Sequence, residues 1–270
     1  MIEAAARCLI RILPEKPALS LLCSLAGRIR PLPVSSSQQA AMGEASRLRY
    51  GAGGRQVAWS WGKGPVVMLV HGWGGRAAQM APLAVSLARQ GFRAVAPDIT
   101  GHGDSPNRRS SWGHFLGDIA ALPAVLGGRA HACIGHSAGG LAMMAARAQH
   151  GFGAERYIAV CAPSFPYPPI VAVKKRLDPP AGILERYKGH IAAQFGGPWT
   201  ALESGSAFAG AGANLLVIHD PSDRYLDGGD AGRIAALCPD AQFVELKGYG
   251  HQKILGSAAL AELAIGFLGR

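Results

Sequence analysis

Apolar runs alternate with amphipathic stretches along most of the chain. Residues 65–70 form a continuous apolar run, which is typical of a parallel strand buried on both faces. Residues 77–90, which follow it, carry apolar side chains at the spacing of a helix. The predicted strands are residues 47–50, 56–61, 65–70, 92–96, 131–134, 157–161, 215–219 and 242–246, and the predicted helices are residues 77–90, 112–126, 141–148, 231–237 and 257–268.

Strands that alternate with helices predict the α/β class, with a mostly parallel central sheet and helices on both of its faces. The alternation stops between residues 162 and 213, which are rich in proline and glycine. We expect an insertion at about residues 163–210 to form a short cap over a cleft, with one helix near residues 183–195. The apolar residues expected to face a substrate are Phe165, Tyr167, Ile170, Val171, Ile183, Leu184 and Phe195.

Two amphipathic helices are predicted before this region. Residues 2–13 and 18–29 both place apolar side chains on one face, and Pro31 and Pro33 end the second stretch. Residues 34–43 are rich in Ser, Gln and Ala and are expected to be a linker. We therefore divide the chain into an N-terminal part, residues 1–43, and a domain, residues 44–270. Packing of the two helices on the flank of the domain is favoured over a homodimer contact or a membrane-surface contact.

Composition excludes several classes of protein. Of the 270 residues, 49% are hydrophobic and 16% are charged, so the chain can bury a large core and is not expected to be disordered. The net charge of +10 comes mostly from scattered arginines, without interleaved aromatic residues or a nucleic-acid motif. We therefore expect the charge to serve solubility, and we expect no nucleic-acid partner.

The cysteines and the first residues of the chain indicate where in the cell the protein is expected to be. Five cysteines are present, and no pair of them has the spacing of metal ligands, so we expect reduced thiols and no metal. No apolar run reaches the length of a membrane-spanning helix. Glu3, Arg7 and Arg11 interrupt the first stretch, unlike the core of a signal peptide. We therefore predict a cytoplasmic location.

A serine lies at the centre of the strongest motif. Gly135-His136-Ser137-Ala138-Gly139-Gly140 stands between a predicted strand and a predicted helix. A serine at such a turn has strained backbone angles, so its neighbours must be small, as they are here. The turn raises the hydroxyl above the strand end, at a helix N-terminus whose dipole favours negative charge. Because a glycine-rich chain also contains Gly-x-Ser-x-Gly by chance, the prediction that Ser137 is a nucleophile depends on the surrounding motifs.

Other polar motifs follow predicted strands in the same way. His71 follows one strand, Asp220 and Asp223 follow another, and His251 follows the last. In open parallel sheets, ligands bind beyond the carboxyl ends of the strands. We therefore expect these side chains to gather at the edge of the sheet where Ser137 lies.

A serine nucleophile needs a base, and the base needs a carboxylate that holds its tautomer. His251, in a loop expected to be flexible, is the predicted base. Asp223 is the predicted acid and is favoured over Asp220, which directly follows its strand and is expected to cap a turn. The backbone N–H groups of Ala138 and Trp73 are the predicted donors to an oxyanion.

These motifs resemble those of the bacterial serine α/β-hydrolases over about residues 47–270. The matching segments are His71-Gly72-Trp73-Gly74-Gly75, Asp98 with Gly101-His102-Gly103-Asp104-Ser105, the serine motif, His219-Asp220-Pro221-Ser222-Asp223 and Gly250-His251. The resemblance implies the α/β-hydrolase fold and hydrolysis through an acyl-enzyme without a cofactor. It also implies that Asp98 and its loop are structural.

The expected function is hydrolysis of small-molecule carboxylic esters with short to medium acyl chains. Ser137 excludes the members of the resembling group that use an aspartate nucleophile, such as epoxide hydrolases and haloalkane dehalogenases. Thioesterase, amidase, acyltransferase and perhydrolase chemistry stay open, because all use the same three residues. A binding protein of the same fold with little turnover is the alternative from another class.

Overall fold

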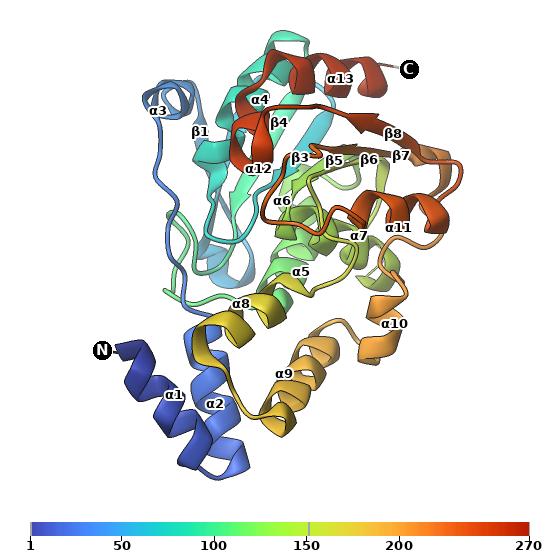
Figure 1. Ribbon diagram of the computed structural model, residues 1–270. Coiled ribbons are helices and arrows are strands. Elements are labelled where there is room, and N and C mark those ends of the chain that lie inside the picture. Colours follow the sequence, from blue (N-terminus) through green and yellow to red (C-terminus); the bar gives the residue numbers. More distant parts are fainter. Residues whose placement is uncertain (1, 151, 270) are drawn as a thin grey trace.

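The computed structural model describes residues 2–150 and 152–269 (Figure 1). Its centre is an eight-stranded sheet in the order β1-β2-β4-β3-β5-β6-β7-β8. The first two strands and β4 pair antiparallel, and all other neighbours are parallel, so the predicted sheet is confirmed. The strands are β1 (Ser46–Tyr50), β2 (Gln56–Trp61), β3 (Val66–Val70), β4 (Arg93–Asp98), β5 (Ala130–His136), β6 (Ala154–Val160), β7 (Leu215–His219) and β8 (Gln242–Glu245).

The sheet separates two hydrophobic cores because successive side chains of a strand point to opposite faces. In β3, Met68 and Val70 belong to one core, whereas Val67 and Leu69 belong to the other. All four side chains are fully buried. This arrangement explains why the central strands are continuously apolar.

Helices cover both faces of the sheet, as predicted (Figure 1). One face carries α4 and α13, and the other carries α5 and α7. The predicted helix over residues 112–126 is divided in two, because Pro123 starts a separate helix. The helices around the sheet are α4 (Ala77–Arg89), α5 (Trp112–Ala121), α6 (Pro123–Leu126), α7 (Ala138–His150), α11 (Asp230–Leu237), α12 (Gly250–Lys253) and α13 (Ala258–Leu268).

Three helices precede the sheet. They are α1 (Ile2–Ile12), α2 (Glu15–Ala26) and α3 (Ser36–Met42). The helix α2 begins three residues before the predicted stretch of residues 18–29 and ends three residues before that stretch does. Its earlier start is possible because a proline, here Pro17, is tolerated in the first turn of a helix. The expectation of a linker over residues 34–43 was wrong. Ser35 and Gln38 form a reciprocal capping box, which starts α3.

The insertion between β6 and β7 holds more helix than expected. It contains α8 (Pro168–Leu177), α9 (Ala181–Gln194) and α10 (Trp199–Glu203), of which only α9 was predicted. The first of these packs against α1, and the second packs against α2. The N-terminal helices and the insertion thus lie together on one side of the molecule (Figure 1).

The described helices lie within residues 2–150 and 152–269. None of the helices described there has both the length and the apolar character that crossing a membrane requires.

Candidate active site

Ser137 lies in the sharp turn between β5 and α7. Its φ angle is 53°, in the left-handed region that a residue with a side chain rarely adopts. The turn needs small neighbours, because a Cβ on Gly135 would lie 2.6 Å from the carbonyl oxygen of Gly139. A Cβ on Gly139 would lie 2.5 Å from the carbonyl oxygen of Val70, in β3. The strained turn is therefore held by backbone contacts on both sides.

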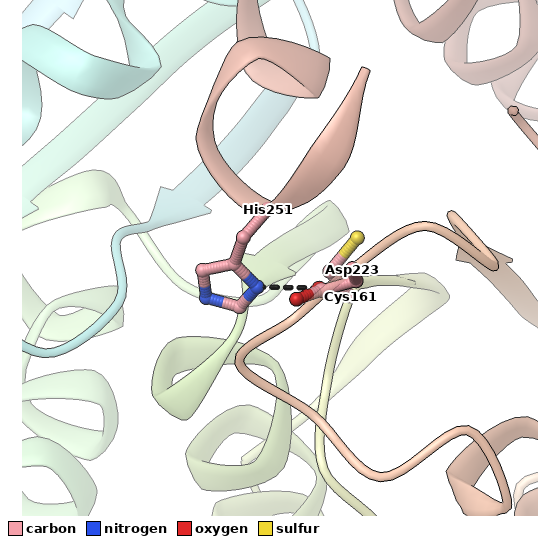
Figure 2. Close-up of side chains that lie close together, drawn as sticks. All are labelled: Cys161, Asp223 and His251. Atoms are coloured by element: carbon pink, nitrogen blue, oxygen red, sulfur yellow. Dashed lines mark hydrogen bonds and ion pairs between the residues drawn. The ribbon is translucent and has the colours of Figure 1, made fainter. Parts of the chain in front are cut away.

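His251 connects Ser137 to Asp223. Its Nε2 lies 3.0 Å from Oγ of Ser137, and its Nδ1 lies 2.6 Å from Oδ2 of Asp223. The imidazole ring of His251 comes from α12, and the carboxylate of Asp223 comes from the loop after β7. Figure 2 shows the two side chains facing each other. The expectation of a flexible loop around His251 was wrong, because this residue is buried within α12.

The carboxylate of Asp223 is kept ionised by its neighbours. Burial opposes ionisation, but the hydrogen bond and charge of His251 and the N–H of Tyr225 lower the pKa of Asp223 below its ordinary value. With Asp223 as acceptor, Nδ1 of His251 carries a proton, and Nε2 is left free to accept one from Ser137. The three side chains thus lie in the geometry that a serine nucleophile, a histidine base and an orienting carboxylate would require.

Asp220 has a different position. Its Oδ1 accepts hydrogen bonds from the amide and hydroxyl of Ser222, and its Oδ2 accepts from the amides of Tyr249 and Gly250. Although burial opposes ionisation, these bonds hold the pKa of Asp220 well below its usual range. Asp220 thus caps its own turn and ties it to the loop that leads into α12.

Three buried histidines fix the loops around Ser137. His71 accepts a hydrogen bond from the amide of Ile99, and His102 accepts one from the amide of Gly74. His136 is 2.7 Å from the carbonyl oxygen of His251, to which its Nε2–H donates. Burial lowers the pKa of His71 to about 4 and the pKa values of His102 and His136 to about 3. All three are therefore neutral, and each holds a neighbouring loop in place through a hydrogen bond.

The amides predicted to bind an oxyanion are without protein acceptors. Trp73 and Ala138 both line the cavity that contains Ser137. Within the described part of the chain, neither backbone N–H donates a hydrogen bond to a protein atom. Their loops touch, because a Cβ on Gly72 would lie 2.9 Å from Cβ of Ser137. Two free donors beside a serine hydroxyl can stabilise negative charge there.

The cavity above Ser137 has a volume of about 370 Å³. The seven apolar residues expected to form its wall are not among those that line it, so this expectation was wrong. Ile183 and Phe195 are buried against the domain, and Val171 faces outward with 57% of its surface exposed. The apolar side chains that do line the cavity include Leu25, Trp112, Val173, Leu177, Tyr187 and Ile191.

Cys161 is a neighbour that the sequence analysis did not connect to the site. Its Sγ lies within 4.8 Å of ligand atoms of Asp223 and His251, a set of groups that could hold a metal ion (Figure 2). Burial raises the pKa of this thiol to about 12, so it is protonated at neutral pH. It is thus a neutral neighbour of Asp223, which is itself paired with His251. The signal that was missed is its place directly after β6, at the same sheet edge as the other residues.

Comparison with known sequences matches residues 63–200, about half of the chain, to a family model described as "Serine aminopeptidase, S33". A curated relative is a non-heme haloperoxidase of Rhodococcus erythropolis, 35% identical over 95 residues, which are 34% of this chain and 35% of that protein. The chain spans about a third to a half of the length of the curated relatives that it matches.

Solved structures confirm the predicted α/β-hydrolase fold. An epoxide hydrolase from Vigna radiata aligns with a TM-score of 0.61 and 18% identity over 84% of this chain and 99% of that chain. An esterase from Thermogutta terrifontis aligns with a TM-score of 0.58 and 18% identity over 83% of this chain and 98% of that chain. At such identity the likeness concerns the fold alone.

The buried histidines predict a loss of stability in mild acid. Between the pKa of about 6.5 in an unfolded chain and the folded values of about 4 and 3, the unfolded chain binds protons that the folded chain does not. The free energy of unfolding should therefore fall as the pH is lowered from about 7 to about 5, with a slope that approaches about 1.4 kcal/mol per pH unit for each such histidine once the pH is well below the unfolded pKa.

Urea unfolding at several pH values measures this slope. In the variant His102→Gln, the amide oxygen of the glutamine can accept the hydrogen bond from Gly74. The slope of the free energy of unfolding against pH should then be smaller by the contribution of one histidine. His190→Gln, at an exposed position of α9, should leave it unchanged. Equal slopes in the two variants would contradict the conclusion that His102 is neutral in the folded chain.

Proposed function

The chain belongs to the serine aminopeptidase S33 family of the α/β-hydrolase superfamily. We propose that it hydrolyses carboxylic esters through an acyl-enzyme on Ser137. The observation that carries the proposal is the pair of contacts made by His251, at 3.0 Å to Ser137 and at 2.6 Å to Asp223. The resemblance found in the sequence is confirmed at the level of the superfamily.

In the proposed reaction, His251 takes the proton of Ser137 as the serine oxygen attacks the ester carbonyl. The amides of Trp73 and Ala138 bind the oxyanion of the tetrahedral intermediate. The imidazolium is stabilised by Asp223, whose lowered pKa keeps it ionised. His251 then gives its proton to the leaving alcohol. In the second half of the reaction, water attacks the acyl-enzyme, and His251 takes a proton from the water and returns it to Ser137 as the acid product leaves.

The description of the family favours amide or peptide substrates as a second candidate, because an aminopeptidase cleaves a peptide bond. The same three side chains would serve, but the leaving amine must be protonated by His251 as it departs. A nitroanilide and a nitrophenyl ester of the same acyl group separate the two candidates. A kcat/KM for the anilide that equals or exceeds that for the ester would favour the peptidase.

Ser137→Ala should abolish turnover of 4-nitrophenyl butyrate, by about a thousandfold or more, because it removes the nucleophile. The control is Ser110→Ala, whose buried hydroxyl lines the same cavity without a hydrogen-bond partner in the described part of the chain. A fluorophosphonate should label Ser137 in the unaltered chain and in this control. Labelling of a different residue, with Ser137 unmodified, would reject the proposal.

The two aspartates should differ in their effects. Asp223→Asn should lower kcat by roughly a hundred- to ten-thousandfold, because an amide can hold His251 in the wrong tautomer. Asp220→Asn should act mainly on stability, because the two donors on one of its oxygens would then face an NH2 group. Kinetics and thermal unfolding of both variants measure the difference. A larger loss of kcat in Asp220→Asn would assign the acid role to that residue.

The cavity volume of about 370 Å³ is near the small end of ligand pockets and favours short to medium acyl chains. Each added methylene buried against the apolar wall contributes about 0.8 kcal/mol, so kcat/KM should rise a few-fold per carbon until the cavity is full. Nitrophenyl esters from acetate to palmitate, kept below micelle-forming concentrations, measure the profile. A continuous rise to palmitate, with activation at a lipid interface, would indicate a lipase instead.

A further inference from the structure

The cavity above Ser137 has a wall that lies outside the segment matched by the family. Helices α1 and α2 and the residues after them supply this wall, whereas the match begins at residue 63. In Figure 1, α1 and α2 lie below the sheet, beside α8 and α9. The lining residues from this N-terminal wall are Glu3, Ala6, Cys23, Leu25, Ala26, Gly27, Arg28 and Arg30.

The N-terminal wall is firmly attached. Ala18 and Leu22 of α2 are fully buried in the core that includes α9. Arg7 donates to the carbonyl oxygens of Lys175 and Arg176, and so caps the C-terminal end of α8. These contacts fix α1 and α2 in place as one side of the cavity.

The backbone after α2 joins this wall to the loop beside Ser137. The amide of Ser110 donates to the carbonyl oxygen of Gly27, at 2.8 Å. The amide of Leu32 donates to the carbonyl oxygen of Gly74, also at 2.8 Å. The segment that carries Arg28 and Arg30 is thus held at both ends.

The cavity rim carries more positive than negative charge. Three arginines line it, Arg28, Arg30 and Arg176, and its one carboxylate is that of Glu3. A single oxygen of Glu3 accepts hydrogen bonds from Arg176, at 2.6 Å and 3.1 Å, and from Arg30, at 3.2 Å. Within the described residues, Arg28 has no carboxylate partner. The carboxylate of Glu3 is thus shared by Arg30 and Arg176, and Arg28 adds a third positive charge to the rim.

Glu3 also shows which anion fits this rim. Its carboxylate already rests between two guanidinium groups, which bind planar carboxylates well. The hydrogen bonds and charge of Arg176 lower its pKa, so it is ionised at neutral pH. The inner lining, with Leu25, Val173 and Leu177, is apolar. The cavity thus combines an apolar body with a cationic rim.

We propose that this cavity selects esters whose acyl chain ends in a second, ionised carboxylate, with Arg28 and Arg30 as specificity-determining residues. The inference rests on the proposed function and adds the class of substrate. The apolar chain lies between the N-terminal wall and α8, and the terminal carboxylate reaches the rim. Glu3 holds Arg30 and Arg176 in place and competes with the substrate for them.

The test compares two pairs of substrates, and the members of each pair differ in the charge of the terminal group and in one methyl group. They are the 4-nitrophenyl half-esters of adipic and suberic acid and the same compounds capped as methyl esters. The unaltered chain should prefer the charged form of at least one length, with a ratio of kcat/KM of about three- to tenfold, as expected for a partly exposed ion pair.

Two variants should move this ratio in opposite directions. The double variant Arg28→Gln/Arg30→Gln should bring it to about one. Glu3→Gln, which removes the competing charge, should raise it about two- to threefold. Opposite shifts cannot arise from a general loss of folding. Arg89→Gln, at an exposed position in the last turn of α4, removes one positive charge elsewhere and should leave the ratio unchanged.

A ratio at or below one for both lengths in the unaltered chain would overturn the inference. A ratio that is the same in the double variant and in Arg89→Gln would also overturn it. Turnover of the methyl-capped substrates that depends on Ser137 tests the proposed function separately. Its absence would reject that function, whereas its presence without a charge preference would reject only the inference.

Discussion

The close approach of two backbones, at the turn that carries Ser137, is the constraint on which the site depends. Gly139 lies against the end of β3, and Gly135 lies against Gly139, at distances that leave no room for a side chain. This packing maintains Ser137 at a φ of 53°. It also brings the loop of Trp73 beside the serine hydroxyl. The position of the Ser137 hydroxyl and the position of the two free amides therefore have one cause.

Hydrogen bonds between the backbone and neutral histidines, together with hydrogen bonds that one carboxylate accepts, hold the surrounding loops. His71, His102 and His136 have no charge to desolvate, so burial is compatible with their role. Asp220 is ionised and buried, but four donors compensate it.

The sheet and the residues at its edge could be predicted from the sequence, because strand period and motif order are local signals. The roles assigned to Ser137, Asp223 and His251 stay predictions, although the structure brings their side chains into contact. The helix α3 was missed although its capping box is also local, since the composition of the segment suggested a linker.

The cavity wall could not be predicted, because it depends on which helices pack together. A helical pattern tells which face is apolar but not what covers that face. Phe195 was expected to face a substrate, yet it is buried, whereas Leu25 of the N-terminal wall faces the cavity. The contact between α1 and α8 joins residues such as Arg7 and Arg176, which are 169 positions apart in the chain.

That separation has a consequence for the order of folding. Contacts between distant segments form late, because closing a long loop costs entropy before any contact compensates it. During synthesis, α1 and α2 emerge well before α8 and α9 exist, so Leu22 has no partner in the insertion at that stage. The first helices to be made are thus expected to be among the last to reach their final place, and to need protection from aggregation in the meantime.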